Sequence, residues 1–324
     1  MDTANESVGH TGVTLTKGRD ASNTHGLQKA LLRDFQRRLR DVRGGIRGTI
    51  IDNDALELST NIDAEEAYDF PRTQAKAQAF MRDIRSWLRQ KLLGKNTSEA
   101  QVRGGDWWLV EYLQEAYQVG ASTGEGRLMQ AGLGIEASGV ETLLQRPIAQ
   151  QQLADLYARA FENLKGVTED AARQLRETLT AGVAEGLNPR DMAAALSEQL
   201  DSIERARLAT IARTEVMQSH ADAAIDVYRQ HDTDVVAHTS RLTAKDTSVC
   251  AFCRALGDIP FTLAEFQTVT VSWGGQPRRI GVPAHANGRC SPMPEVGLDS
   301  DDLDPLDERI PDAAGGRPIT ILNT

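Results

Sequence analysis

The sequence contains few cysteines and no long apolar run, and each absence excludes a class of protein. Only 3 cysteines occur among 324 residues, too few for a framework of paired disulfides. No stretch approaches the roughly 18 consecutive apolar residues of a membrane-spanning helix, so we expect no contact with a membrane. The polar stretch Met1–Asp20 lacks an apolar segment, and no signal peptide is predicted.

Positive charge is also in short supply. The chain has 36 Lys and Arg against 46 Asp and Glu, a formal net charge of −10. A protein that binds nucleic acid through overall positive charge is therefore excluded. Apolar residues make up 40% of the chain, enough for a buried core, and its length allows two domains.

Apolar residues recur at helical spacing over most of residues 26–230. A run with six glycines, 120–139, interrupts this pattern and predicts a flexible connection. Asn188-Pro189 is a strong helix start, because Asn caps a helix and proline fits its first turn. Short connections between the later helices favour antiparallel neighbours in a bundle. One helix is predicted to begin near Gly26 and another near Asn188. Further helices are predicted over residues 73–93, 107–121, 147–164, 168–186 and 202–230.

From residue 233 the pattern changes from helical to strand-like. Residues 234–242 predict a strand, and 269–273 and 278–282 flank Gly274-Gly275-Gln276-Pro277 as a hairpin. After Pro294 acidic residues dominate, which predicts an exposed tail.

The three cysteines fall inside this β-rich stretch and form a metal-ligand pattern with one histidine. Cys250, Cys253, His285 and Cys290 give the spacing C-x2-C-x31-H-x4-C. Three thiolates and an imidazole suit a tetrahedral Zn²⁺ site, and four protein ligands make a closed, structural site. One zinc ion would supply on the order of 10 kcal/mol to a module whose own core is small. Three reduced cysteines without a metal, or a site with one ligand missing, are the alternatives.

The predicted fold is therefore mainly α. It is an elongated helical bundle followed by a small zinc-stapled β-rich module, with a disordered or extended N-terminal arm and an acidic C-terminal tail. The expected parts are a flexible arm (1–25), an N-terminal helical region (26–139), a helical bundle ending in a long helix (140–232), the zinc module (233–296) and the tail (297–324).

The first predicted helix has a basic face. Between Arg19 and Arg47 there are eight Lys and Arg against three Asp. Such a face is either simply solvated or contacts an acidic protein surface or DNA phosphates. The candidate contact residues are Arg33, Arg37, Arg38, Arg40 and Arg43.

Two zinc-enzyme patterns were tested against the cysteine spacing. Nucleobase deaminases place H-x-E before the cysteine pair, whereas here the pair comes first and Asn287 stands where the Glu would be. An HNH-type nuclease needs a free histidine beside its zinc, for which His238 is the candidate. We expect no catalytic set and hence no enzyme.

Residues 164–290 resemble the Mu F-like minor head proteins, the phage head morphogenesis family. The matching motifs are Gly186-Leu187-Asn188-Pro189, Ile211-Ala212-Arg213-Thr214-Glu215, Thr243-Ala244-Lys245-Asp246, the pair Cys250/Cys253, Leu256-Gly257, Phe261, Pro283, His285 and Arg289-Cys290. Two positions depart from the family pattern: Thr239-Ser240-Arg241 stands where the family often has Trp, and Ser291 follows the last cysteine instead of a basic residue.

The resemblance implies a virion structural protein at or near the portal vertex. Its implied partners are the portal protein and the inner capsid surface, with packaged DNA as a further candidate for the basic helix. It would act in head assembly and in genome packaging or delivery, in the head interior, after assembly in the host cytoplasm. Some relatives carry an ADP-ribosyltransferase domain, so a virion enzyme of that kind or a nuclease is the alternative.

Arg213 and Glu215 lie two residues apart on a helix and so point to different faces. We expect each to have its own partner in a structural polar cluster: Glu215 the backbone of the zinc module, and Arg213 either Asp246 or a carbonyl.

Overall fold

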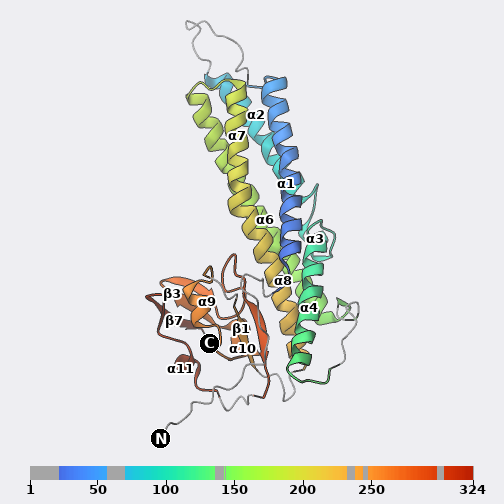
Figure 1. Ribbon diagram of the computed structural model, residues 1–324. Coiled ribbons are helices and arrows are strands. Elements are labelled where there is room, and N and C mark those ends of the chain that lie inside the picture. The colour runs from blue at the N-terminus through green and yellow to red at the C-terminus, as the bar shows by residue number, and fades with distance from the viewer. Residues whose placement is uncertain are drawn as a thin grey trace. The chain divides into compact units, whose positions relative to one another are not determined.

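The computed structural model describes residues 22–56, 70–135, 142, 144–231, 238–243, 247–297 and 303–323 (Figure 1). The described residues are mostly helical, with small antiparallel sheets in the C-terminal part of the chain, as predicted. Two compact units are present. The sheet unit comprises residues 1–26, 113–152 and 216–324, and the helical unit comprises 27–112 and 153–215. Each unit combines separate stretches of chain, and the domain boundaries expected from the sequence stay a prediction.

The helices are labelled as in Figure 1. Among the described residues they are α1 (His25–Arg47), α2 (Phe70–Leu88), α3 (Glu99–Arg103), α4 (Val110–Gln130), α6 (Pro147–Ala184), α7 (Pro189–Ile203) and α8 (Ala209–Gln230), with π-helical turns η1 (Gly48–Asp52), η2 (Arg89–Leu93) and η3 (Glu204–Leu208). Three short helices follow among the strands: α9 (Ala251–Ala255), α10 (Leu263–Thr268) and α11 (Leu306–Arg309). Within the described residues no helix is both long and apolar enough to span a membrane.

Helix α1 confirms the predicted apolar stripe. The side chains on its buried face are Leu31, Phe35, Leu39, Val42 and Ile46. Aromatic rings continue this core within the helical unit, where they pack against one another. Phe35 meets Trp108 edge-on with ring centroids 5.4 Å apart, and Trp107 meets Phe161 at 5.3 Å.

Three helix boundaries differ from those predicted. Residues 147–164 and 168–186 were expected as two helices, but α6 runs unbroken through Gly166. Leu164 and Thr168 are both buried there, and the Thr168 hydroxyl donates to the Leu164 carbonyl at 2.8 Å. Burial on both sides outweighs the roughly 1 kcal/mol cost of a glycine in a helix. The helix expected over 202–230 does not start at Ser202, because this residue lies inside α7, which continues through η3 into α8.

The glycine-rich run 120–139 is not a flexible connection up to residue 130, because α4 extends to Gln130. A Cβ atom on Gly120 would lie 2.2 Å from the carbonyl oxygen of His220 on α8. On Gly124 it would lie 3.2 Å from the Cα atom of Ala224. The glycines here permit close approach of two helices, a role that composition alone does not distinguish from flexibility.

Helix starts follow local chemistry. The Asn188 side chain accepts hydrogen bonds from the backbone N–H groups of Arg190 and Asp191, which confirms the predicted cap. Helix α2 begins at Phe70 with Pro71 in its first turn, where a proline is tolerated.

The strands form two antiparallel sheets. The first has the order β2-β1-β5, from Phe261–Thr262, His238–Leu242 and Ser291–Glu295. The second has the order β4-β3-β7-β6, from Gln276–Arg279, Thr270–Trp273, Arg317–Asn323 and Ala313–Ala314. The predicted hairpin is confirmed, with a two-residue turn at Gly274 and Gly275, both at positive φ.

Both chain ends were expected to be unstructured, and the described residues at each end are not. In the C-terminal region β7 pairs with β3 and places Ile319 in the core, so Arg317–Asn323 is a strand and not an exposed tail. Near the N-terminus Ser22 and Thr24 are buried, and the Thr24 hydroxyl lies 3.5 Å from the Met217 sulfur. The rest of the predicted arm, 1–21, lies outside the described residues.

Candidate metal centre

The cysteine pair sits at the start of a short helix in the sheet unit. Cys250 is the N-cap residue of α9 (Ala251–Ala255), and its sulfur accepts a hydrogen bond from the Cys253 backbone N–H at 3.3 Å. An N-cap side chain and the residue three positions later lie at the same helix end. The C-x2-C spacing thus brings both sulfurs to one point.

A turn on another segment brings His285 to the same point. Its Nε2 atom lies 3.3 Å from the Cys250 sulfur and 3.4 Å from the Cys253 sulfur. The turn is closed by a hydrogen bond from the Gly288 N–H to the His285 carbonyl, and Asn287 adopts a positive φ in it. The other ring nitrogen, Nδ1, lies 2.8 Å from the Ala286 carbonyl oxygen. A proton on Nδ1 would satisfy that carbonyl and leave the Nε2 lone pair for a metal.

The three side chains form a ligand cluster whose donor atoms all lie within 4.8 Å of one another. Cys253 is buried, whereas Cys250 and His285 are half-buried. Two thiols and an imidazole are the donors that a zinc ion prefers, so the residues present fit this metal. The expectation that 250, 253 and 285 meet in space is therefore supported by geometry.

The ionisable groups of the cluster affect one another. The hydrogen bond with Cys253, followed by burial, raises the pKa of the Cys250 thiol to about 11. The hydrogen bond with Cys250 raises the pKa of His285, against the opposing effect of burial. Protons therefore compete with a metal ion for these donor atoms.

Cys290, the fourth predicted ligand, is buried directly before β5, and its sulfur is not part of the three-residue cluster. None of the three cysteines forms a disulfide. Cys290 lies five residues after His285 in the chain. Its role as a fourth metal ligand stays a prediction.

Residues 173–293 match the family model described as Phage Mu protein F like protein. The chain carries a Mu F-like region. It covers a little over a third of the sequence, from the second half of α6 through most of β5. The resemblance inferred from the sequence motifs, which placed the region at 164–290, is thereby confirmed. Comparisons with curated proteins and with solved structures gave no match.

The Mu F-like region includes a buried carboxylate whose partners differ from those expected. Glu215 is 2% exposed and accepts hydrogen bonds from Arg159 Nη2 at 3.1 Å and Asn163 Nδ2 at 2.8 Å. Both of these partners are on α6, whereas the sequence led us to expect partners in the zinc module. The motif marks a helix–helix contact instead. Arg213 is half-buried, and Asp246 lies outside the described residues.

Sequence reasoning did not identify the residues that hold β5. Arg127 on α4 is buried and donates to the Ser291 hydroxyl at 2.8 Å and to the Pro292 carbonyl. The Tyr228 hydroxyl on α8 donates to the same carbonyl at 3.2 Å. A lone arginine in a glycine-rich helix carries no motif, so no sequence signal pointed to it.

The predicted basic face of α1 divides into two groups. Arg38 lies 3.7 Å above the Trp108 ring and donates to the Lys91 carbonyl, and Arg43 pairs with Asp201 and Glu204. These two arginines stabilise the helical unit from within. Arg33, Arg37 and Arg40 are exposed and remain candidates for an external contact.

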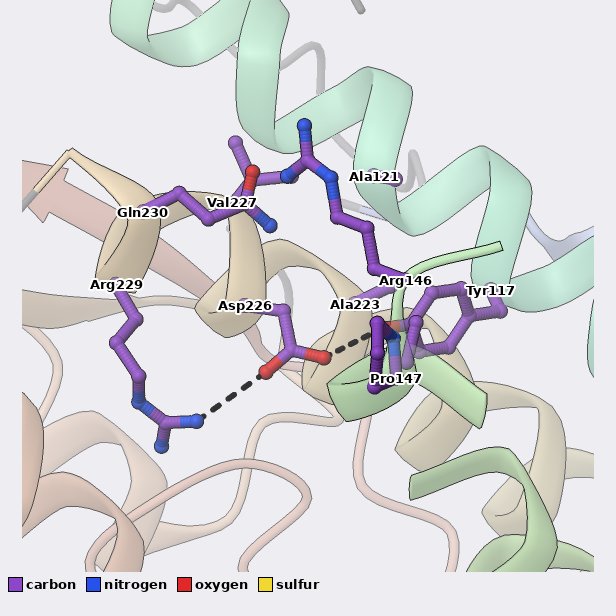
Figure 2. A pocket seen from close by; sticks show the side chains of 10 residues that line it. Tyr117, Ala121, Arg146, Pro147, Ala223, Asp226, Val227, Arg229 and Gln230 are labelled. Carbon is purple, nitrogen blue, oxygen red and sulfur yellow. Dashed lines mark hydrogen bonds and ion pairs between the residues drawn. The ribbon is translucent and has the colours of Figure 1, made fainter. Parts of the chain in front are cut away.

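A second polar site of the sheet unit lies in a cleft of about 400 Å³ (Figure 2). The Tyr117 hydroxyl donates to Asp226 Oδ2 at 2.5 Å, and Gln152 donates to Asp226 Oδ1 at 2.6 Å. Burial raises the pKa of Asp226, an effect that these hydrogen bonds oppose. Arg229 lies 3.4 Å from the same carboxylate. The Asp226 carboxylate thus has three protein partners. Through them it connects α4, α6 and α8, which is a structural role.

Proposed function

We propose that this protein is a minor head component of a phage particle, located in the head interior or at the portal vertex. The observation that carries the proposal is the Mu F-like match over residues 173–293. Its proposed partners are the portal protein and the inner capsid surface, and its proposed role is in head assembly and in genome packaging or delivery.

We further propose that the Cys250–Cys253–His285 cluster holds one zinc ion with Cys290 as the fourth ligand. The cluster joins the α9 end to the 283–288 turn, and Cys290 would add the start of β5. These segments are far apart in the sequence. A shared ion would hold them together without the larger hydrophobic core that they would otherwise need. A closed site leaves no position for substrate, which supports a structural role.

Metal analysis of the purified full-length chain tests the zinc proposal. We expect about one zinc per chain, and loss of zinc together with the near-ultraviolet circular dichroism of the sheet unit in Cys253→Ser and His285→Asn. His231→Asn, at the end of α8, is the matched control and should keep the metal. A purified chain without zinc that still shows a folded sheet unit contradicts the proposal.

Cys290→Ser decides between a closed and an open site. Loss of zinc in this variant supports four protein ligands. If this variant still holds about one zinc per chain, the ion has three protein ligands and an open coordination position. That result would contradict the structural role.

Sedimentation of the full chain with purified portal rings tests the proposed location. We expect the chain to sediment with the rings at a fixed stoichiometry, and with capsid shells that contain a portal more than with shells that lack one. Equal binding to both shells would place the protein elsewhere in the head. The alternative, a zinc enzyme of the virion, gains no support from the family match, and NAD turnover or DNA cleavage by the purified chain would favour it.

A further inference from the structure

One face of α1 presents a row of exposed positive charges opposite its buried stripe. The exposed side chains are Lys29, Arg33, Arg37, Arg40 and Arg47, here called the cationic row. Their spacing of four, four, three and seven residues keeps them on one side of a helix. With a rise of about 1.5 Å per residue, the row is roughly 27 Å long.

The cationic row has almost no partners within the helical unit. Arg37 pairs with Asp34. Among the residues that the structure describes, none forms a hydrogen bond or ion pair with Lys29, Arg33, Arg40 or Arg47. By contrast, Arg38 and Arg43 on the neighbouring faces are held by internal contacts. The row therefore provides charge for a surface outside its own unit.

The two units differ sharply in charge, and the difference points to a partner. The sheet unit has 22 Asp and Glu against 13 Lys and Arg, a formal charge of −9, whereas the helical unit has 24 against 23. The acidic residues of the sheet unit include exposed Asp304, Asp307, Glu308 and Asp312 in and around α11 (Leu306–Arg309). Arg309, the basic residue of α11, forms an ion pair with Glu265 at 2.6 Å. This acidic surface is complementary to the cationic row.

We propose that the cationic row of one copy binds the acidic α11 surface of a second copy. Such a contact is either made twice, in a reciprocal two-fold dimer, or made head-to-tail, in a ring or a filament. What favours a second copy is the local complementarity of the two surfaces, and binding of the row to DNA phosphates is an outcome of the test below. The proposal does not depend on the proposed zinc site.

Sedimentation velocity of the full-length chain, with zinc in the buffer, at low and high salt tests this proposal. We expect self-association at about 50 mM salt that weakens steeply towards 300 mM, because exposed charges are screened beyond about 10 Å. Arg33→Glu/Arg40→Glu should weaken association at least about tenfold. The matched control reverses one exposed arginine of α2 and one of η2, Arg82→Glu/Arg89→Glu, and should associate like the unchanged protein.

A charge exchange separates the proposed contact from a general charge effect. Asp307→Lys/Glu308→Lys alone should also weaken association, and mixing it with the Arg33→Glu/Arg40→Glu chain should restore binding between the two variants. A chain that stays monomeric at low salt, or variants that fail to restore binding, would overturn the proposal. Salt-sensitive binding to a short DNA duplex that is lost in Arg33→Glu/Arg40→Glu, with no self-association, would assign the row to DNA instead.

Discussion

Replacing Gly120 with alanine should destabilise the protein although alanine is the better helix former. Gly120 lies in the middle of α4, and an added Cβ atom would lie 2.2 Å from the His220 carbonyl oxygen and 2.7 Å from its Cα atom. Both atoms belong to the backbone of α8 and cannot rotate away. The two helices would have to separate, which opens space along their whole contact.

The size of the effect follows from comparison with Gly126, six residues further along the same helix. No atom lies within 4 Å of a Cβ added there. Gly126→Ala should therefore stabilise by up to about 1 kcal/mol, the helix-propensity difference between the two residues. Gly120→Ala gains the same amount but adds the cost of overpacking, about 3 kcal/mol at the upper end of the usual range. The difference between the two variants isolates the clash, and Gly124→Ala should fall between them.

Urea unfolding followed by circular dichroism, with zinc held constant in the buffer, measures this difference. We expect Gly120→Ala to be less stable than the unchanged chain by about 2 kcal/mol and less stable than Gly126→Ala by about 3 kcal/mol. Equal free energies of unfolding for the two variants would refute the close helix contact and would restore the interpretation of this run as a flexible connection.

Three further predictions concern buried or capping polar groups. Burial lowers the pKa of His220 to about 3, so the unfolded chain, with an ordinary value of about 6.5, takes up a proton that the folded chain does not. The stability contributed by neutral His220 is complete above pH 6.5 and falls by up to about 1.4 kcal/mol per pH unit down to about pH 3. The difference in unfolding free energy between the unchanged chain and His220→Met should show this slope with pH. A difference that does not change with pH would refute the prediction. Asn188→Ala should cost about 1 kcal/mol through loss of the α7 cap, measured by urea unfolding, and an unchanged midpoint would show that the cap is unimportant. Glu215→Ala should cost about 1–3 kcal/mol because Asn163 and Arg159 lose a buried acceptor; an equal loss in Asn163→Ala would assign the effect to that one hydrogen bond.

Patterns that depend on nearest neighbours in the chain were predictable. The α1 stripe, the Asn188 cap, the Gly274-Gly275 turn and the Cys250–Cys253 pair each rest on side chains a few residues apart, whose relative positions follow from helix, turn or strand geometry alone. The family motifs belong with these, since they too are local. Sequence alone therefore determined a mainly helical protein with a cysteine-bearing β-rich part and a Mu F-like region.

Apart from the meeting of His285 with the cysteine pair, contacts between residues distant in the chain were decided by the tertiary structure. Gly120 and Gly166 are both glycines that sequence reading treats as helix breakers. Gly120 lies inside α4 against the backbone of a neighbouring helix, and Gly166 lies inside the continuous helix α6. Glu215 found its hydrogen bonds on α6, and the apparently free C-terminal segment became β7 because β3 offered it an unpaired edge. The burial of a group, and with it the cost of leaving that group unpaired, depends on which segments meet, and residue order does not specify that.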